Sequence, residues 1–391
     1  MIRQRARVLT FVLLAFAGAC SRDVPDVTAV ATAADDAIAI DVTPASASLA
    51  PGATQQFAAT VRTRGGGTLD HARVTWSTAD PSIATVSVTG LVTAVANGST
   101  TVSATFAAAA GTAQVRVEVV LRDVLIFTND SVLYGDIMVM HPDGSGRRRI
   151  THDGAGYEAP AISRDGRRIA YAQYNNGTRG IYLMNADGTD RSLLISRSLF
   201  DGEPAWSPDG SQIAFRSLNP GPYGDYGRIF VINVDGTGLR QVSPETDPAT
   251  YSFDGSPSWS PDGSKIAYDR NGQTAIINAD GTGLTLIGGG EHPSWSPDGT
   301  RFAFEGVSEG TTHIYVCNAD GSNPVRITSG SPNQENTAHW SPDSRRIVFN
   351  RVADDYTFQI YVINADGTDE VYLSHVGGGI DDSWPNWSPL P

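Results

Sequence analysis

The hydrophobic residues of this chain fall into short runs separated by glycine- and proline-containing turns. From residue 37 onward, alternating or continuous apolar runs recur, for example at Gln56–Val61, Lys265–Tyr268 and Ile360–Ile363. Short apolar runs bounded by turn residues are typical of β-strands, and no helical periodicity competes with them. After the first 20 residues, no apolar stretch is long enough to cross a bilayer. The pattern therefore predicts an all-β fold.

Residues 37–120 form the first β-rich region. Ile38, Ile40 and Val42 alternate with polar residues, further strand-like runs follow, and a single tryptophan, Trp76, lies near the middle. About seven short strands around one central tryptophan predict a β-sandwich of the immunoglobulin type. The segment VTWSTADPSIATVSVTGLVTAVANGSTTVSAT (74–105) resembles the bacterial Ig-like group 2 (BIG2) family. The resemblance implies that Trp76 packs between the two sheets and that the module is a spacer.

Residues 121–391 contain two alternating motifs. An Asp-Gly turn follows an apolar run six times, at Asp143, Asp187, Asp235, Asp280, Asp320 and Asp366. A Trp-Ser-Pro-Asp-Gly-like turn also occurs six times, from Ser163-Arg164-Asp165-Gly166 to the truncated Trp387-Ser388-Pro389. A period of about 45 residues with four strands is typical of a propeller blade. Both motifs have a sufficient explanation as hairpin turns, so we do not assign their aspartates to a metal.

The two ends of this region complement each other. It begins with Val124–Phe127, a second blade strand without a first, and it ends with Trp384–Ser388, a first strand without the others. The sequence therefore predicts a six-bladed β-propeller closed by its C-terminal strand, which leaves no exposed sheet edge. The repeats resemble the PD40 (WD40-like) repeats of the TolB family. The α/β domain of TolB does not precede them, because the Ig-like module occupies that place.

The first 20 residues have the features of an export signal. Arg3, Arg5 and Arg7 precede the apolar run Val8–Phe16, and Ala17-Gly18-Ala19-Cys20 follows. These last four residues resemble the lipobox of bacterial lipoproteins, which implies acylation of Cys20 and attachment to the membrane through this lipid only. By the same resemblance, Ser21 favours the outer membrane, with the protein facing either the periplasm or the outside. The alternative is an ordinary signal peptide with an incidental cysteine. Residues 21–36 are predicted to be a flexible tether.

The net charge of −14 is unevenly distributed. Residues 1–120 carry 8 acidic and 8 basic side chains, whereas residues 121–391 carry 34 acidic and 20 basic side chains. A negative field repels nucleic-acid phosphates, so we exclude nucleic acid as a partner, and it favours cations or basic partners. Solubility alone is the other explanation. Because only Cys20 and Cys317 are present, an internal disulfide framework is excluded.

A candidate site lies on the face of the propeller that carries the variable loops. Acidic residues precede the innermost strand of every blade and are predicted to form a ring at the channel mouth, next to two histidines. The ring would attract a basic peptide or a divalent metal, unless these acids merely populate solvated loops. The predicted channel-mouth residues are Glu158, Asp201, Glu203, Asp254, Glu291, His292, Glu335, His339, Asp381 and Asp382.

Aromatic residues fall in the same variable loops. Exposed aromatic side chains beside polar groups suit a peptide or sugar surface, although they can also pack on each other. The predicted aromatic rim consists of Tyr157, Tyr174, Tyr223, Tyr226, Tyr251, Tyr356 and Trp384.

The sequence favours a binding function over catalysis. It contains no Gly-x-Ser-x-Gly elbow and no His-Glu-x-x-His motif, and Cys317 lies in an apolar run typical of a core residue. We therefore expect a non-catalytic, monomeric protein of the bacterial cell envelope whose propeller binds a protein, peptide or glycan. The alternative is a metal-assisted polysaccharide lyase or hydrolase that uses His292 and His339. No organic cofactor is expected, and a divalent cation in the channel is the one candidate cofactor.

Overall fold

The structure is a computed structural model. It describes residues 37–70, 72–130, 135–175, 177–198, 200–219, 226–244, 253–328, 333–374 and 381–388. The predictions for Cys20 and the tether lie outside these residues. In the described part of the chain all regular elements are strands, and no helix suited to crossing a membrane is found there. The chain divides into two compact units, Met1–Glu118 and Val119–Pro391.

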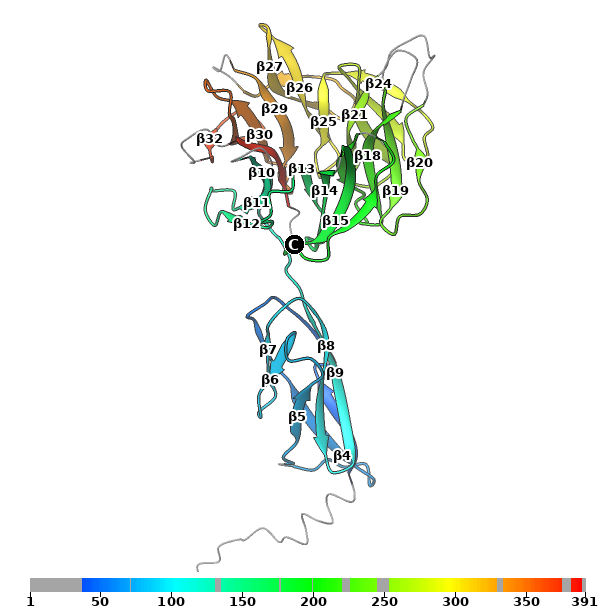
Figure 1. The fold of residues 1–391 in the computed structure, drawn as a ribbon, viewed down its shortest axis with the longest axis vertical. Helices are drawn as coiled ribbons and strands as arrows, with labels where there is room; N and C mark the ends of the chain where they lie inside the picture. Colours follow the sequence, from blue (N-terminus) through cyan, green and yellow to red (C-terminus); the bar gives the residue numbers. More distant parts are fainter. Residues whose placement is uncertain are drawn as a thin grey trace, which may run out of the picture. The chain divides into compact units, whose positions relative to one another are not determined.

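The first unit is a β-sandwich (Figure 1). Its strands are β1 (Ala37–Thr43), β2 (Ser46–Leu49), β3 (Thr54–Gln56), β4 (Ala58–Thr63), β5 (Thr75–Thr78), β6 (Ala84–Val86), β7 (Leu91–Ala94), β8 (Gly98–Phe106) and β9 (Ala109–Val117). They pair as β1-β4, β2-β9-β8-β5 and β3-β7-β6. The alternation seen in the sequence is the cause of this packing, since β9 buries every second residue.

Trp76 of the first unit packs against the sandwich core. Its ring is partly buried beside a cluster that includes Phe57, Val61 and Val102. Gly90 has φ +83°, and a Cβ there would lie 2.9 Å from the Trp76 ring. The turn residue is therefore a glycine for two reasons, the backbone angle and the space that the indole takes.

The second unit contains six four-stranded antiparallel sheets among its described residues (Figure 1). The first sheet is β33 (Asp381–Trp387), β10 (Leu125–Asp130), β11 (Asp136–Met140) and β12 (Arg148–Arg149). The second is β13 (Tyr157–Ile162), β14 (Arg168–Asn175), β15 (Thr178–Asn185) and β16 (Ser192–Ile195), and the third is β17 (Asp201–Trp206), β18 (Gln212–Asn219), β19 (Tyr226–Asn233) and β20 (Arg240–Gln241). The fourth is β21 (Asp254–Trp259), β22 (Lys265–Arg270), β23 (Gln273–Asn278) and β24 (Thr285–Gly288). The fifth is β25 (Glu291–Trp295), β26 (Arg301–Ser308), β27 (Thr311–Asn318) and β28 (Val325–Arg326), and the sixth is β29 (Glu335–Trp340), β30 (Arg346–Val352), β31 (Phe358–Asn364) and β32 (Val371–Tyr372).

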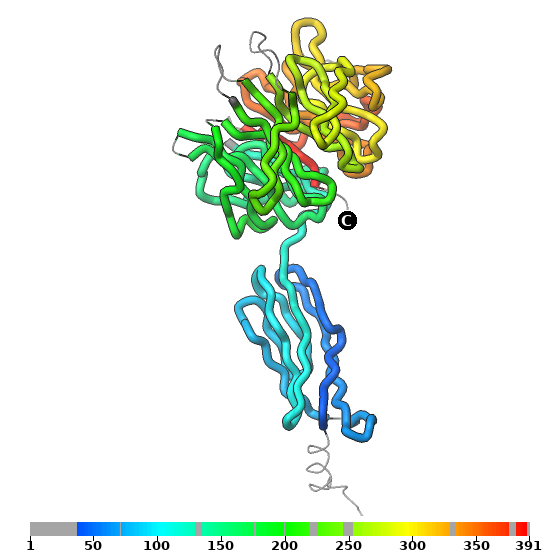
Figure 2. Tube along the Cα trace, turned by 90° about the vertical axis from the view of Figure 1, so that its right-hand side faces the viewer, coloured from blue at the N-terminus to red at the C-terminus, as the bar shows by residue number. Residues whose placement is uncertain are grey.

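The first strand of each sheet lies next to the first strands of the neighbouring sheets. We call β33, β13, β17, β21, β25 and β29 the inner strands. Each inner strand contacts the next, and β33 contacts both β29 and β13. The C-terminal strand, red in Figure 2, is antiparallel to β10, with Leu125 opposite Trp387. The first sheet thus combines residues from both ends of the unit.

The repeated motifs form hydrogen-bonded turns. After each of five inner strands, a serine hydroxyl donates to the aspartate two residues later, as Ser260 does to Asp262 at 2.6 Å. The same hydroxyl accepts the amide of the returning strand, here Lys265 at 2.9 Å. The equivalent serine–aspartate pairs are Ser163–Asp165, Ser207–Asp209, Ser296–Asp298 and Ser341–Asp343. In the first sheet Ser388 instead accepts the amide of Val124 at 2.9 Å.

Candidate functional site

Every inner strand contains one non-glycine residue in the left-handed backbone region. The six residues occupy equivalent places, three positions before the tryptophan or isoleucine that ends the strand, and pairing with the second strand shifts register at each of them. We call them the bulge ring. Its members are Ala159 (φ 46°), Glu203 (56°), Ser256 (49°), His292 (50°), Thr337 (52°) and Trp384 (54°).

The bulge ring is strained, and its strain is repeated. Left-handed backbone at a residue with a Cβ costs about 1–3 kcal/mol, and such residues cluster at ligand-binding and switch sites. A β-bulge re-aims a side chain, and all six of these side chains line one axial cavity. The same backbone thus presents six different side chains to the same space.

The cavity extends along the inner strands from the bulge ring to the turns at the other end. Its volume is about 660 Å³, inside the range of about 300–1,000 Å³ typical of ligand pockets. The walls are rich in proline and in the tryptophans of the repeated motif. These tryptophans are Trp206, Trp259, Trp295, Trp340 and Trp387.

Three of the six tryptophans that line the cavity donate their indole N–H to the protein's own backbone. Nε1 of Trp206 donates to the carbonyl of Ala161 at 3.0 Å, and Trp259 and Trp340 bond equivalent carbonyls at 3.2 and 3.1 Å. Each of these bonds joins one inner strand to the preceding one. The cavity wall therefore combines tryptophan and proline surfaces with polar side chains such as Glu203, Ser256 and His292.

The predicted acid ring is not a ring of free carboxylates. Asp201, Asp254, Glu335 and Asp382 are fully buried and do not line the cavity. Asp254 and Asp382 form two-pronged ion pairs with Arg270 and Arg147, each at 2.7 Å. Asp201 accepts the amide of Arg197 at 2.7 Å and the hydroxyl of Ser198 at 2.9 Å.

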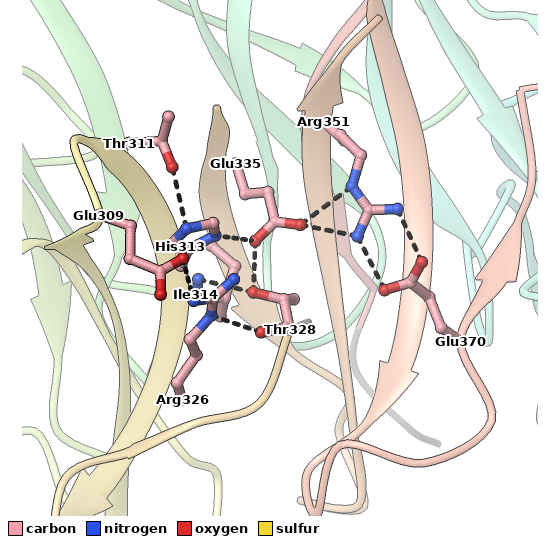
Figure 3. Close-up of polar contacts among 9 residues, drawn as sticks. All are labelled: Glu309, Thr311, His313, Ile314, Arg326, Thr328, Glu335, Arg351 and Glu370. Atoms are coloured by element: carbon pink, nitrogen blue, oxygen red, sulfur yellow. Dashed lines mark hydrogen bonds and ion pairs between the residues drawn. The ribbon is translucent and has the colours of Figure 1, made fainter. Parts of the chain in front are cut away.

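Glu335 illustrates the structural role of these buried acids (Figure 3). Its carboxylate accepts from Arg351 at 2.6 Å, lies 3.1 Å from His313 Nδ1, and bonds the Thr328 hydroxyl. These partners belong to the fifth and sixth sheets, so the acid joins neighbouring sheets. The prediction that these four acids are exposed at the channel mouth was wrong. A carboxylate can be buried when it has hydrogen-bonding or cationic partners, and the spacing of residues in the sequence does not show where those partners lie.

The other predicted acids lie nearer the surface, and most are also paired. Glu158 and Glu203 form ion pairs with Arg179 at 2.6 Å and Arg216 at 3.0 Å. Burial raises the pKa of Glu158, against the opposing effect of Arg179. Asp381 accepts the amide of Phe358 at 2.8 Å. Of the ten predicted channel-mouth residues, only Glu203, His292 and His339 line the cavity within the described part of the chain.

Around its bulge residue, the fifth sheet differs from the other sheets in the partners of its acidic side chains. Glu291 is exposed and lies opposite Glu305 of β26, which is buried. His292 Nδ1 lies 3.1 Å from Glu305 Oε1. Burial alone would lower the pKa of His292, but the Glu305 carboxylate raises it to about 9. Burial and the charge of Glu291 raise the pKa of Asp269, on the neighbouring sheet, to about 7.

Burial shifts the pKa values of His339 and Cys317 toward their uncharged forms. Burial lowers the pKa of His339 to about 4, with a further contribution from the charge of His292, so its imidazole is neutral. Cys317 is buried in β27, and burial raises the pKa of its thiol to about 11.

The residues of the predicted aromatic rim differ in exposure. Tyr174 and Tyr356 are exposed, and Trp384 lines the cavity as a bulge-ring residue. Tyr157 and Tyr226 are buried, so the prediction that they form the rim was wrong. Tyr157 packs edge-on against Tyr171 and donates to Asp153. Tyr223 and Tyr251 lie outside the described residues.

Sequence reasoning missed three bulge-ring residues, Ala159, Ser256 and Thr337, because they carry no charge or ring. A signal exists for Ala159 and Ser256, although not for Thr337. In five of the six inner strands the bulge residue directly precedes a proline, as in Glu203-Pro204 and His292-Pro293. Arg164, at the turn position where other repeats carry proline, also lines the cavity and donates to the carbonyl of Pro261 at 3.5 Å.

Comparison with known families agrees with this architecture. Residues 37–119 match the family model described as "Bacterial Ig-like domain (group 2)", and residues 122–291 match the one described as "TolB beta propeller domain". The chain is therefore an all-β protein in which a bacterial Ig-like domain precedes a TolB-like propeller. The curated proteins searched include no match to it.

Several solved structures share the fold. TolB from Acinetobacter baumannii aligns with a TM-score of 0.58 and 15% identity, covering 75% of this chain and 80% of that one. A putative TolB from Agrobacterium tumefaciens aligns with a TM-score of 0.52 and 19% identity, covering 68% and 99%. Hydrazine synthase from Kuenenia stuttgartiensis aligns with a TM-score of 0.50 and 14% identity, covering 67% and 46%. At these identities the likeness concerns the fold alone, and function has to be argued from the site.

Proposed function

We propose that the propeller is a non-catalytic binding module of the bacterial cell envelope, which holds an extended, largely apolar peptide segment of a partner protein in its axial cavity. The Ig-like domain is the spacer between this module and a lipid on Cys20. The observation that carries the proposal is the cavity of about 660 Å³, lined by six strained bulge residues and by tryptophan and proline.

The chemistry of the wall favours a peptide over a glycan. A glycan presents many hydroxyls, and each buried hydroxyl without a partner costs about 1–3 kcal/mol. Three of the six indole donors of the wall already bond backbone carbonyls, and the prolines carry no N–H. Apolar and proline side chains, in contrast, bind well in aromatic-lined grooves.

The two ends of the cavity differ in charge. Near the bulge ring, Glu203 is paired with Arg216, but Glu291 has no arginine partner within the described residues, whereas Arg164 lies at the turn end. Such a difference would orient an extended segment, with a basic group near the bulge ring and an acidic group near Arg164.

Filling the cavity tests the proposal. Trp384 shows that the bulge backbone accommodates tryptophan, so Ala159→Trp adds bulk to the cavity without a new backbone geometry. Peptides selected from a displayed random library on the wild-type chain, in EDTA, should bind Ala159→Trp at least about tenfold more weakly, a loss of about 1.4 kcal/mol. Leu286→Trp, on the outer strand β24 where Leu286 is 52% exposed, is the matched control and should bind normally. Equal binding to all three proteins, or no enriched peptide, contradicts the proposal.

The alternative of a metal-assisted lyase or hydrolase has one observation in its favour, the group formed by Glu291, His292 and Glu305. Cleavage of a polysaccharide by the zinc-loaded chain, absent in EDTA, would support that alternative over the binding function.

A further inference from the structure

The fifth sheet gathers three side chains of metal-binding type at one point. Glu291 and His292 are consecutive on β25, and Glu305 lies opposite Glu291 on β26. One ligand atom from each of the three lies within 4.8 Å of the others. Strand pairing fixes the two glutamates relative to each other, and the bulge fixes the backbone of His292.

The other sheets show how this protein normally neutralises carboxylates at this depth. Glu158, Glu203, Asp254, Glu335 and Asp382 each form an ion pair with an arginine at 3.0 Å or less. For Glu291 and Glu305 no arginine partner is found in the described residues, and the only cationic group beside them is His292. The fifth sheet therefore has two carboxylates opposite each other, neither of which has an arginine partner within the described residues.

The His292 ring is held beside the Glu305 carboxylate. His292 Nδ1 is shielded from solvent, and the partner that it faces within the described residues is Glu305 Oε1, 3.1 Å away. That oxygen already accepts the amide of Thr337 at 2.6 Å, which holds the carboxylate in place. Two ligands at about 2.1 Å from a tetrahedral ion are roughly 3.4 Å apart, close to the separation seen here.

We propose that Glu291, His292 and Glu305 bind a divalent transition-metal ion of the zinc class at the bulge-ring end of the cavity. Imidazole nitrogen and carboxylate oxygen are zinc ligands, whereas calcium and magnesium prefer oxygen alone. Three protein ligands leave one tetrahedral position for another donor. Because His292 lines the cavity, that position is accessible to a molecule held there. The site is independent of the proposed peptide binding, which is measured in EDTA.

Three substitutions can test the site without disturbing the backbone or the core. Ala159 occupies the bulge position of another sheet, so His292→Ala places alanine on a backbone that already accepts it. Glu291 is exposed, so Glu291→Gln removes one ligand charge without disturbing the core. His339→Ala is the matched control, because His339 lines the same cavity outside the group and alanine occurs at the equivalent Ala161 and Ala205.

The experiment titrates the metal-free full chain with Zn²⁺ by calorimetry and with Co²⁺ by visible absorption. We expect one equivalent of Zn²⁺ and the absorption bands of four-coordinate cobalt. His292→Ala should weaken binding by at least about 100-fold and Glu291→Gln by at least about tenfold, since even groups behind the ligands contribute about 10–100-fold. His339→Ala should bind like wild type, and the melting curve of each metal-free variant checks that it folds.

Three results would overturn the assignment. These are no saturable Zn²⁺ binding by wild type, a site unchanged in His292→Ala, and tighter binding of Ca²⁺ than of Zn²⁺. Loss of the site in His339→Ala but not in His292→Ala would place an ion elsewhere in the cavity and would equally reject these three ligands.

Discussion

The two ends of the inner strands use repetition in opposite ways. At the turn end, the same serine and aspartate side chains make the same hydrogen bonds in five sheets, with lengths of 2.6–2.7 Å. At the bulge end, the backbone angle repeats in six sheets, with φ between 46° and 56°, but the side chains are Ala, Glu, Ser, His, Thr and Trp. Repeated side chains indicate a structural role, whereas a repeated backbone with varied side chains indicates an adaptable surface.

The buried acids lie two residues before the bulge ring in the sequence. Their substitution therefore separates residues that stabilise the fold from residues available for binding. Glu335→Ala leaves Arg351 and His313 without their buried carboxylate, and we expect it to destabilise the propeller by about 3–5 kcal/mol. Denaturant unfolding measures this loss. The control is Glu291→Ala on the neighbouring inner strand, which should change stability by no more than about 0.5 kcal/mol because Glu291 is exposed. Similar effects for both variants would remove the distinction between the two acids.

The strain of the bulge ring can be measured with two alanines of β13. Ala161 is buried in ordinary strand backbone, so Ala161→Gly should cost about 1–2 kcal/mol through chain entropy and the lost methyl group. Ala159 has φ 46°, so Ala159→Gly should be neutral or stabilise by up to about 1 kcal/mol. Urea unfolding of the pair compares the same chemical change two residues apart. Destabilisation by Ala159→Gly as large as that by Ala161→Gly would show that the bulge is unstrained.

The smallest expected effect is a pH-dependent change in stability at the turn end of the inner strands. Hydrogen bonds from the Ser260 hydroxyl and from Ser264 lower the pKa of Asp262 from 3.8 to about 2. A folded-state pKa below the unfolded value means that the stabilisation is complete above pH 3.8 and is lost as pH falls through about 2. In Ser260→Ala we expect the pKa of Asp262 to rise toward 3.8, measured by NMR titration of its carboxyl carbon. The stability difference between Ser260→Ala and wild type should also shrink between pH 6 and pH 2, and a constant difference would argue against this linkage.

The sequence predicted the all-β class, the order of the two domains and the structural role of the Asp-Gly and Trp-Ser turns. These features follow from local periodicity and turn chemistry, which a single sequence displays directly. Cys317 was also placed correctly in the core, because an apolar strand surrounds it.

The site was harder to predict, for a physical reason. Whether an acid such as Asp254 or Glu335 faces solvent depends on arginines 16 residues away in the chain, and spacing does not show where those arginines point. The bulge reverses the usual alternation of side chains, so counting back from the tryptophan placed Asp201 in the channel and overlooked Ser256. Bulge residues with a charge or an aromatic ring, such as Glu203 and Trp384, were the ones that the sequence could identify.

The pairing of β33 with β10 has a consequence for the order in which this protein matures. Leu125 and Trp387 lie side by side in one sheet, although more than 250 positions separate them along the chain. During synthesis from the N-terminus, β10 therefore cannot pair with β33 until nearly all of the propeller has been made. Contacts of such long range form slowly, and until they form, β10 is open to pairing with other chains. One edge of β10 therefore has no partner from the propeller until β33 has been made.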